Sequence, residues 1–393
     1  MNRSPGNNDK GTFPHYMLKE IHEQPTTLKH VMEGRLDHGK ATARLAGIHR
    51  TAREIRNWKS IIFTGCGSSL NAALVGEYII ESLARIPVEC EYASEFRYRN
   101  RPLAANQAVF AVTQSGETGD TLAALREAKL KGTSIFGICN NPISTLGRES
   151  EGGIDMRAGD EYGIVATKTF TAQLTILAML GLELGRMIGL THAQGSEILT
   201  ALEKLPALVA ETLELDAQIR LIAQTYKSAG NFLFFGRQAN FPIALDGALK
   251  LEEMTHIPAS GHPSAELEHG VAAMINKTTA SVFIALQDEV FDKNLGNISR
   301  VKDLTAPVIA IGTKGDTSLD GVCDDVVLIP QAPDYLQPVL AAIPLQLLAY
   351  HLATFLGSDI DKPRNPINNT TAKSTNVMSA TSGNRPVVQE DLS

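Results

Sequence analysis

Two patterns of hydrophobic residues alternate along this chain: short continuous apolar runs, and longer segments in which apolar residues recur every three or four positions. In the first half, apolar runs occupy 60–63, 88–92, 108–112 and 134–138, and helical spacing follows most of them. Strands that alternate with helices form parallel sheets covered on both faces. The first half therefore predicts an α/β domain.

The same alternation restarts after a long helical stretch. Residues from about 171 to 229 have helical spacing and predict a connector. Beyond it, strands are expected at 232–235, 280–286, 307–311 and 326–329, with helices at 242–256 and 339–356. The second half thus repeats the architecture of the first with few identical residues. This predicts two tandem subdomains, each a parallel sheet flanked by helices in three α/β/α layers.

The two ends of the chain differ from these halves. From Met17 to about Arg56 the spacing is helical, and Pro25 is expected to break this stretch into two helices. The last thirty or so residues are rich in Asn, Thr, Ser and Pro, which is typical of a loop. We divide the chain into an N-terminal lead-in with helices (1–56), a first subdomain (57–195), a helical connector (196–229), a second subdomain (230–361) and a C-terminal tail (362–393).

Composition limits the class of partner. The 393 residues are 43% hydrophobic and 20% charged, as in a soluble protein of two to three domains. A net charge of -7 argues against a nucleic-acid partner but not against a small phosphate ligand. The four cysteines form no CxxC pair, so we expect neither a disulfide framework nor a zinc site. No signal core and no stretch of membrane-span length is recognised, so we expect a cytoplasmic protein without a membrane partner.

The first candidate site is the glycine-containing turn GCGSS, which follows the run at 60–63. Glycines allow a ligand to approach the backbone closely, and the N-terminus of the next helix attracts anions. Ser68 and Ser69 could donate hydroxyl hydrogen bonds to a phosphate. A simple strand-to-helix turn with capping serines explains the same pattern equally well.

The second candidate is the sequence TQSGET, after the run at 108–112. In an open parallel sheet, ligands bind beyond the carboxyl ends of the strands, so two such turns can converge on one phosphate. So many hydroxyl and amide groups exceed what helix capping requires. The chain contains neither a GxxxxGK[ST] nor a GxGxxG motif, which disfavours a nucleotide ligand.

The third candidate is a group of charged residues in the second half. Asp246, Lys250 and Glu253 recur at helical spacing, and Glu266 and His269 follow in a loop. A carboxylate can move a proton between adjacent sugar carbons, and a histidine can open a sugar ring by moving the hemiacetal proton. The competing interpretation, a solvated charged helix face with an incidental surface histidine, is the one that the pattern alone favours.

A series of sequence blocks extends in order from about Met17 to Asn365: MLKEIHEQP, CGSS, ASEFRYR, TQSGETGDT, ATKTFTAQL, ALDGALKLEE, ELEHG, IPLQLLAYHLA and DIDKPRN. Together they resemble the isomerase part of the glutamine–fructose-6-phosphate amidotransferases (glucosamine-6-phosphate synthases), within the SIS, or sugar isomerase, superfamily. The resemblance covers most of the chain and implies two tandem SIS subdomains.

The resemblance also implies roles for individual residues. Six positions match those that hold the sugar phosphate: Ser68, Ser69, Thr113, Gln114, Ser115 and Thr118. Four more match catalytic groups. Glu253 matches the carboxylate that moves a proton between C1 and C2, and Lys250 its neighbouring lysine. His269 matches the ring-opening histidine, which in this family comes from the partner subunit, and Lys373 resembles the lysine of a tail that closes the site.

Some features depart from the family pattern. The family enzyme begins with a glutaminase domain that has a nucleophilic cysteine, and nothing in this sequence corresponds to it. Asp246 stands where the family has a glutamate, Ala166 replaces a serine, and Glu268 replaces a lysine. The tail is lengthened by residues 366–370, so Lys373 lies farther from the PRN block than in the family.

The hypothesis that follows is an amino-sugar phosphate isomerase or deaminase. It would interconvert fructose 6-phosphate plus ammonia and glucosamine 6-phosphate through ring opening and C1–C2 proton transfer, without glutamine hydrolysis. A fructosamine 6-phosphate deglycase and a non-catalytic sugar-phosphate sensor are the alternatives. The presence of both Glu253 and His269 favours an enzyme. No metal or cofactor is expected, and a histidine from the partner subunit implies a homodimer or a higher homo-oligomer.

Overall fold

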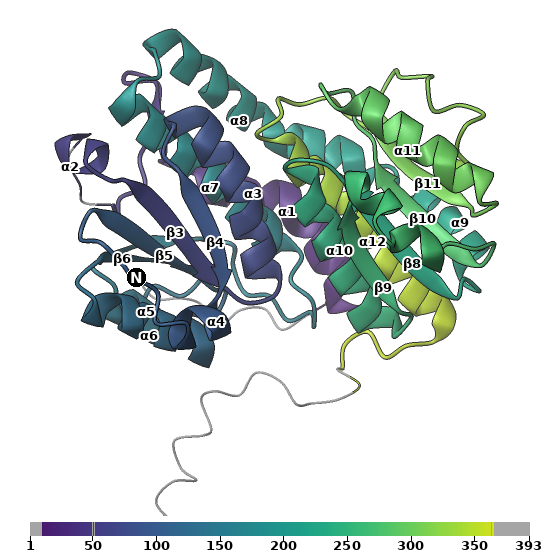
Figure 1. The fold of residues 1–393 in the computed structure, drawn as a ribbon, viewed down its shortest axis with the longest axis horizontal. Coiled ribbons are helices and arrows are strands. Elements are labelled where there is room, and N and C mark those ends of the chain that lie inside the picture. Colours follow the sequence, from purple (N-terminus) through teal and green to yellow (C-terminus); the bar gives the residue numbers. More distant parts are fainter. Residues whose placement is uncertain (1–9, 49, 51, 363, 365–393) are drawn as a thin grey trace, which may run out of the picture.

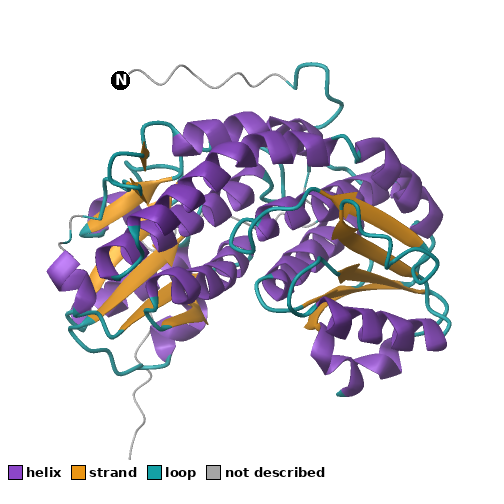
Figure 2. Cartoon of the chain, turned by 90° about the horizontal axis from the view of Figure 1, so that it is seen from above, coloured by secondary structure: helices purple, strands orange, loops and turns teal. Residues whose placement is uncertain are grey.

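The computed structural model describes residues 10–48, 50, 52–362 and 364 of the chain. Two five-stranded parallel sheets lie at opposite ends of the molecule, and helices fill the space between them (Figure 1). The view from above shows the same arrangement, with helices on both faces of each sheet (Figure 2). The expected fold of two tandem α/β subdomains is therefore confirmed.

The first sheet has the strand order β4-β3-β5-β6-β7. Its strands are β3 (Ser60–Gly65), β4 (Val88–Tyr92), β5 (Gln107–Val112), β6 (Ser134–Cys139) and β7 (Gly152–Asp155). Its helices are α3 (Ser68–Ala84), α4 (Ala93–Tyr98), α5 (Gly119–Leu130), α6 (Thr145–Glu149) and α7 (Lys168–Ile188). Alternate residues of β5 enter opposite cores, because side chains of a strand point to opposite faces. Phe110 packs with α3 and α7, and Val109 packs with α4, α5 and α6.

The second sheet has the equivalent order β12-β11-β10-β8-β9. Its strands are β8 (Asn231–Gly236), β9 (Ala259–Pro263), β10 (Thr279–Ile284), β11 (Val308–Thr313) and β12 (Asp325–Ile329). Its helices are α10 (Asn240–Thr255), the short 3-10 helices η1 (Ser264–Glu268) and η2 (Val271–Met274), α11 (Phe291–Asp303) and α12 (Gln337–Leu356). In both sheets the order reverses beside the first strand, which creates the switch point where α/β sheets bind ligands.

The remaining elements join the two halves. They are α1 (Tyr16–Met32), β1 (Leu36–Asp37), β2 (Thr42–Ala43), α2 (Ala52–Arg56), α8 (His192–Leu213) and α9 (Asp216–Tyr226). α1 packs on α7, α8 and α12, and α10 of the second half packs on α3 of the first. One hydrophobic core runs through both halves, so the helices fix the two sheets relative to each other.

Pro25 does not break α1, contrary to expectation. A proline inside a helix lacks the N–H that would bond to the carbonyl four residues earlier, here that of Ile21. The side-chain amide of Gln24 donates to the Ile21 carbonyl at 2.9 Å instead. The neighbouring side chain thus satisfies the acceptor that the proline leaves free. The expected second helix is replaced by the β1–β2 hairpin and the short α2.

Two strands and two helices also differ from expectation. The edge strands β7 and β9 were not predicted, because they are short, contain glycine and are only partly buried. Helices α7 and α12 have the length and mean hydropathy of a membrane span, and 83% of each apolar window is buried inside the protein. The expectation that no stretch reaches such a length needs this qualification. Their burial is that of core helices.

Candidate functional site

A cavity of about 570 Å³ lies at the carboxyl ends of β3 and β5, where the order of the first sheet reverses. The turn after β3, the turn after β5, the loop after β7 and helix α10 line it. All six hydroxyl and amide residues singled out in the sequence line this one cavity: Ser68, Ser69, Thr113, Gln114, Ser115 and Thr118. The two turns therefore converge, as their positions in the sequence predict.

Hydrogen bonds orient the serines of the first turn. The buried amide of Gln173 on α7 donates to the Ser69 Oγ at 3.0 Å. The Lys250 ammonium on α10 donates to the Ser68 Oγ at 3.2 Å. Both hydroxyl oxygens accept, so their protons remain available for an anionic ligand at the N-terminus of α3.

The second turn is held in shape by its own side chains. The hydroxyls of Thr113 and Thr118 lie 2.8 Å apart and share a hydrogen bond, and the Ser115 hydroxyl accepts from the backbone N–H of Glu117 at 3.1 Å. Gly116 has a φ of +71°, and a Cβ there would lie 2.0 Å from the Ser144 Oγ. This turn therefore requires glycine at that position, for both backbone conformation and space.

Lys250 and Asp246 are buried, at 1% and 2% exposure, and form an ion pair one helical turn apart. The ammonium also lies 4.4 Å from the centroid of the Phe170 ring. The interpretation of these residues as a solvated charged face is therefore wrong. Because Lys250 also bonds to Ser68, it links the second half of the chain directly to the turn at the first sheet.

Glu253 lies in the wall of the cavity. Its side chain is exposed through the open mouth, yet the surrounding walls withdraw it from bulk water, which raises its pKa above the ordinary value of 4.5. Lys250 opposes that shift and Asp246 adds to it. A carboxyl with a raised pKa is suited to exchange protons with a bound substrate. Together with Ile164, Glu253 also lines a second cavity of about 650 Å³.

The other candidate residues do not reach the cavity within the described part of this chain. His269 is exposed where η1 ends and is not among the lining residues. Glu266 is exposed in η1. Glu268, which replaces the family's lysine, forms an exposed ion pair with Arg300 on α11. Lys373 lies outside the described residues.

The sequence reasoning missed one wall of the cavity. The loop between β7 and α7 contributes Glu161, Gly163, Ile164, Val165 and Ala166 to the lining. Only Ala166 had been noticed, as a departure from the family pattern. The available signal was the position of the loop, because it too leaves the carboxyl end of a strand.

No group of three or more His, Cys, Asp or Glu side chains among the described residues is arranged to hold a metal ion. The lining side chains provide hydroxyl and amide groups on the two turns and a carboxyl, Glu253, on α10, with the buried Lys250 ammonium behind Ser68.

Comparisons with known proteins agree with this architecture. The family model of the SIS domain matches residues 54–182 and 225–356. The chain is 45% identical to glutamine–fructose-6-phosphate aminotransferase of Chlorobaculum tepidum over 91% of its own length, and 42% identical to that of Bacteroides thetaiotaomicron over 92%. It spans only 58% and 59% of the length of these two relatives.

Solved structures give the same result. The C-terminal domain of glucosamine-fructose-6-phosphate aminotransferase from Francisella tularensis superposes with a TM-score of 0.86 and 35% identity. The match covers 90% of this chain and all of that domain. A glucosamine-6-phosphate deaminase from Thermotoga maritima shares the fold, with a TM-score of 0.71 and 24% identity over 89% of this chain and 98% of that chain.

Proposed function

Because this chain belongs to the SIS domain family, we propose that it interconverts fructose 6-phosphate plus ammonia and glucosamine 6-phosphate. The observation that supports this most strongly is the shared cavity. It combines a hydroxyl-rich pair of turns suited to a phosphate with a carboxyl, Glu253, suited to proton transfer. The similarity to the relatives supports a sugar-phosphate isomerase role, and the specific reaction is our proposal.

The phosphate would bind between the two turns. The six hydroxyl and amide residues line one cavity, and helices α3 and α5 begin there, so both helix dipoles favour an anion. Anchoring the phosphate fixes the position of the sugar carbons relative to α10, which supplies the reacting groups.

Proton transfer is assigned to Glu253. In the synthetic direction, ammonia adds to C2 of the open-chain ketose and water leaves, which gives an imine. Glu253 then removes a proton from C1 and returns it to C2, while the imine nitrogen gains a proton and the C1 hydroxyl loses one, which leaves an aldehyde at C1 and an amine at C2. The electron-rich intermediate requires a nearby positive group. Lys250 is such a group, because its buried ammonium already reaches the Ser68 hydroxyl.

Ring opening is assigned to His269 of a second subunit. The residue is exposed and does not line the cavity of its own chain, so a neighbouring copy would have to bring it there. We therefore propose a homodimer or a higher homo-oligomer in the cytoplasm. The C-terminal segment with Lys373 is proposed to close the site, as the family resemblance implies.

One observation favours a second candidate, a fructosamine 6-phosphate deglycase. The cavity of about 650 Å³ beyond Glu253 and Ile164 offers room for a substituent on the amine. A deglycase would use the same carboxyl but release glucose 6-phosphate and a larger amine. A non-catalytic sensor has less support, since it would need neither the carboxyl of Glu253 nor His269.

Three incubations of the purified protein separate these functions. The substrates are glucosamine 6-phosphate, fructose 6-phosphate with ammonium, and a fructosamine 6-phosphate, and the assays measure ammonia and hexose phosphates. We expect the first two to interconvert. Turnover of the fructosamine alone would identify the deglycase, and binding without turnover of any substrate would identify a sensor.

A further inference from the structure

The loop between β7 and α7, residues 156–167, forms one wall of the cavity without any helix or strand of its own. Its Ile164 lines both cavities together with Glu253, so this loop and Glu253 border both spaces. The position of the loop therefore determines the shape of the site beside the proposed proton-transfer group.

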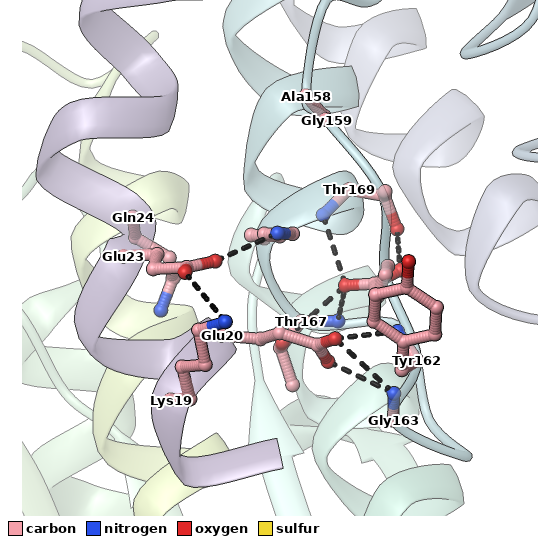
Figure 3. A network of polar contacts seen from close by, with 12 residues as sticks. Lys19, Glu20, Glu23, Gln24, Ala158, Gly159, Tyr162, Gly163, Thr167 and Thr169 are labelled. Atoms are coloured by element: carbon pink, nitrogen blue, oxygen red, sulfur yellow. Dashed lines mark hydrogen bonds and ion pairs between the residues drawn. The ribbon is translucent and has the colours of Figure 1, made fainter. Parts of the chain in front are cut away.

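Glu20 on α1 holds this loop from outside the cavity. Its carboxylate accepts hydrogen bonds from the backbone N–H groups of Tyr162 and Gly163, with Gly163 N at 3.0 Å from Oε2 (Figure 3). Glu20 is only 1% exposed. A Cβ at residue 163 would lie 2.6 Å from the same oxygen, so glycine is required for this close approach.

A second carboxylate holds the other end of the loop. Glu161 Oε1 accepts from the backbone N–H of Thr167 at 2.8 Å and of Thr169 at 3.2 Å, and Oε2 accepts from the Thr169 hydroxyl. These bonds satisfy N–H groups at the start of α7 that have no partner within the helix. The loop is thus bound to α1 at its centre and to α7 at its end.

The charges around Glu20 make this an unfavourable place for a carboxylate. Burial and the neighbouring Glu161 raise the pKa of Glu20 to about 7, and Lys168 on α7 lowers it in part. Lys168 itself pairs with Glu23, which also pairs with Lys19 on the same face of α1. An ionised acceptor forms stronger hydrogen bonds to backbone N–H groups than a neutral one. An ionised Glu20 is therefore electrostatically unfavourable in its own surroundings, although it binds the loop more strongly than a neutral one.

We propose that Glu20 is a positioning residue, whose carboxylate fixes the backbone at Tyr162 and Gly163 and thereby sets Ile164 and the sugar-binding wall of the cavity. The effect on a hexose 6-phosphate rests on the proposed function. The claim that Glu20 positions the loop is independent of the proposed function, since it follows from the hydrogen bonds alone. Protonation of Glu20 weakens these bonds, so the loop loosens as the pH falls below neutrality.

The test compares Glu20→Gln with the matched control Glu183→Gln. Glu183 on α7 is also a buried glutamate that accepts a backbone N–H, that of Leu45 at 3.0 Å, and burial also raises its pKa to about 7. It lies fifteen residues along α7 from Lys168, about 22 Å by helix rise. The control therefore repeats the chemistry away from the cavity.

Two measurements are made on each protein. Hydrogen exchange, corrected for the intrinsic pH dependence, reports peptides that cover 156–167, and titration reports the dissociation constants of fructose 6-phosphate and inorganic phosphate. For Glu20→Gln we expect loop exchange at least tenfold faster, fructose 6-phosphate affinity at least tenfold weaker, and inorganic phosphate affinity within twofold. Glu183→Gln should match the wild type in all three.

The pH dependence adds a readout that a purely structural role would not change. Loop exchange in the wild type should accelerate below about pH 7, and in Glu20→Gln it should not depend on pH in this range. If Glu20→Gln does not fold, the wild-type pH profile and the shorter Glu20→Asp variant test the same bonds.

Unchanged loop exchange in Glu20→Gln would overturn the proposal, as would equal losses for both ligands, because equal losses indicate general disruption of the site. A wild type that binds no hexose 6-phosphate would instead refute the proposed function, while loop exchange would still decide whether Glu20 holds the loop.

Discussion

At the scale of single residues, the site depends on ionisable groups whose surroundings differ within two turns of α10. Lys250 and Asp246 are paired and buried, whereas Glu253 faces the cavity and has a raised pKa. Lys250 of this pair also donates a hydrogen bond to the Ser68 hydroxyl. Helix α10 thus supplies both a buried ion pair and, at Glu253, a carboxyl that can exchange a proton with a ligand.

Replacing Glu253 by Gln should abolish proton transfer but leave the phosphate turns intact. We expect turnover to fall by about 10²–10⁴-fold, the usual contribution of a general base, and the dissociation constant of fructose 6-phosphate to change little. Because the base must be ionised, wild-type kcat/KM should fall as the pH decreases through a pKa above 4.5. Full turnover of the variant would refute the assigned role.

The ion pair of Lys250 and Asp246 makes a separate prediction about stability. Lys250→Met leaves a buried carboxylate without its partner, so the free energy of unfolding should fall by about 3–5 kcal/mol. The double variant with Asp246→Asn should recover much of this loss, because no unpaired charge remains. Urea unfolding measures both. A double variant less stable than Lys250→Met alone would contradict this account.

At the scale of secondary-structure elements, the site is built from what leaves the carboxyl ends of strands. The turns after β3 and β5 supply the hydroxyl groups, and the loop after β7 supplies the opposite wall. Each turn also bonds to another element: Gln173 on α7 donates to the first, and backbone N–H groups at the start of α6 donate to Gly116 and Glu117 of the second. The packing of these helices therefore sets the positions of the hydroxyl groups proposed to bind the phosphate.

The turn after β5 can be tested through its glycine. Gly116→Ala should destabilise the protein by about 2–4 kcal/mol, since it adds backbone strain to a clash with the Ser144 hydroxyl. Gly132→Ala is the matched control, because Gly132 also has a positive φ of +77° but open space around it, and it should cost about 1 kcal/mol. Thermal unfolding measures the loss of stability in each variant, and phosphate titration reports whether the turn still binds the anion. Equal losses in the two variants would exclude the contact with Ser144 as the cause.

At the scale of the whole molecule, the site joins the two halves and is proposed to need a second subunit. Mixing Glu253→Gln and His269→Ala subunits tests this directly. Each variant alone should be inactive, whereas a hybrid dimer regains one intact site from Glu253 of one chain and His269 of the other. Random mixing should restore about a quarter of wild-type activity, because half of the dimers are hybrids with one restored site each. No recovery after subunit exchange would place both groups in one chain.

The alternation of apolar runs and helical spacing determined the architecture, since a buried parallel strand and an amphipathic helix have recognisable periods. The hydroxyl-rich turns after two of the apolar runs led to the prediction that they converge on one site, and Ser69 and Ser115 do line one cavity. The edge strands β7 and β9 were missed because partly buried, glycine-containing segments have no such period.

The tertiary structure alone decided which charged residues are buried and what holds the loops. The spacing of Asp246 and Lys250 suits a solvated helix face equally well, and only their packing against the first half shows them to be an interior pair. Likewise, nothing near Glu20 in the sequence indicates that it contacts Tyr162 and Gly163. Periodicity is a local property of the chain, whereas burial and hydrogen-bond partners depend on segments that are distant in sequence and meet only after folding.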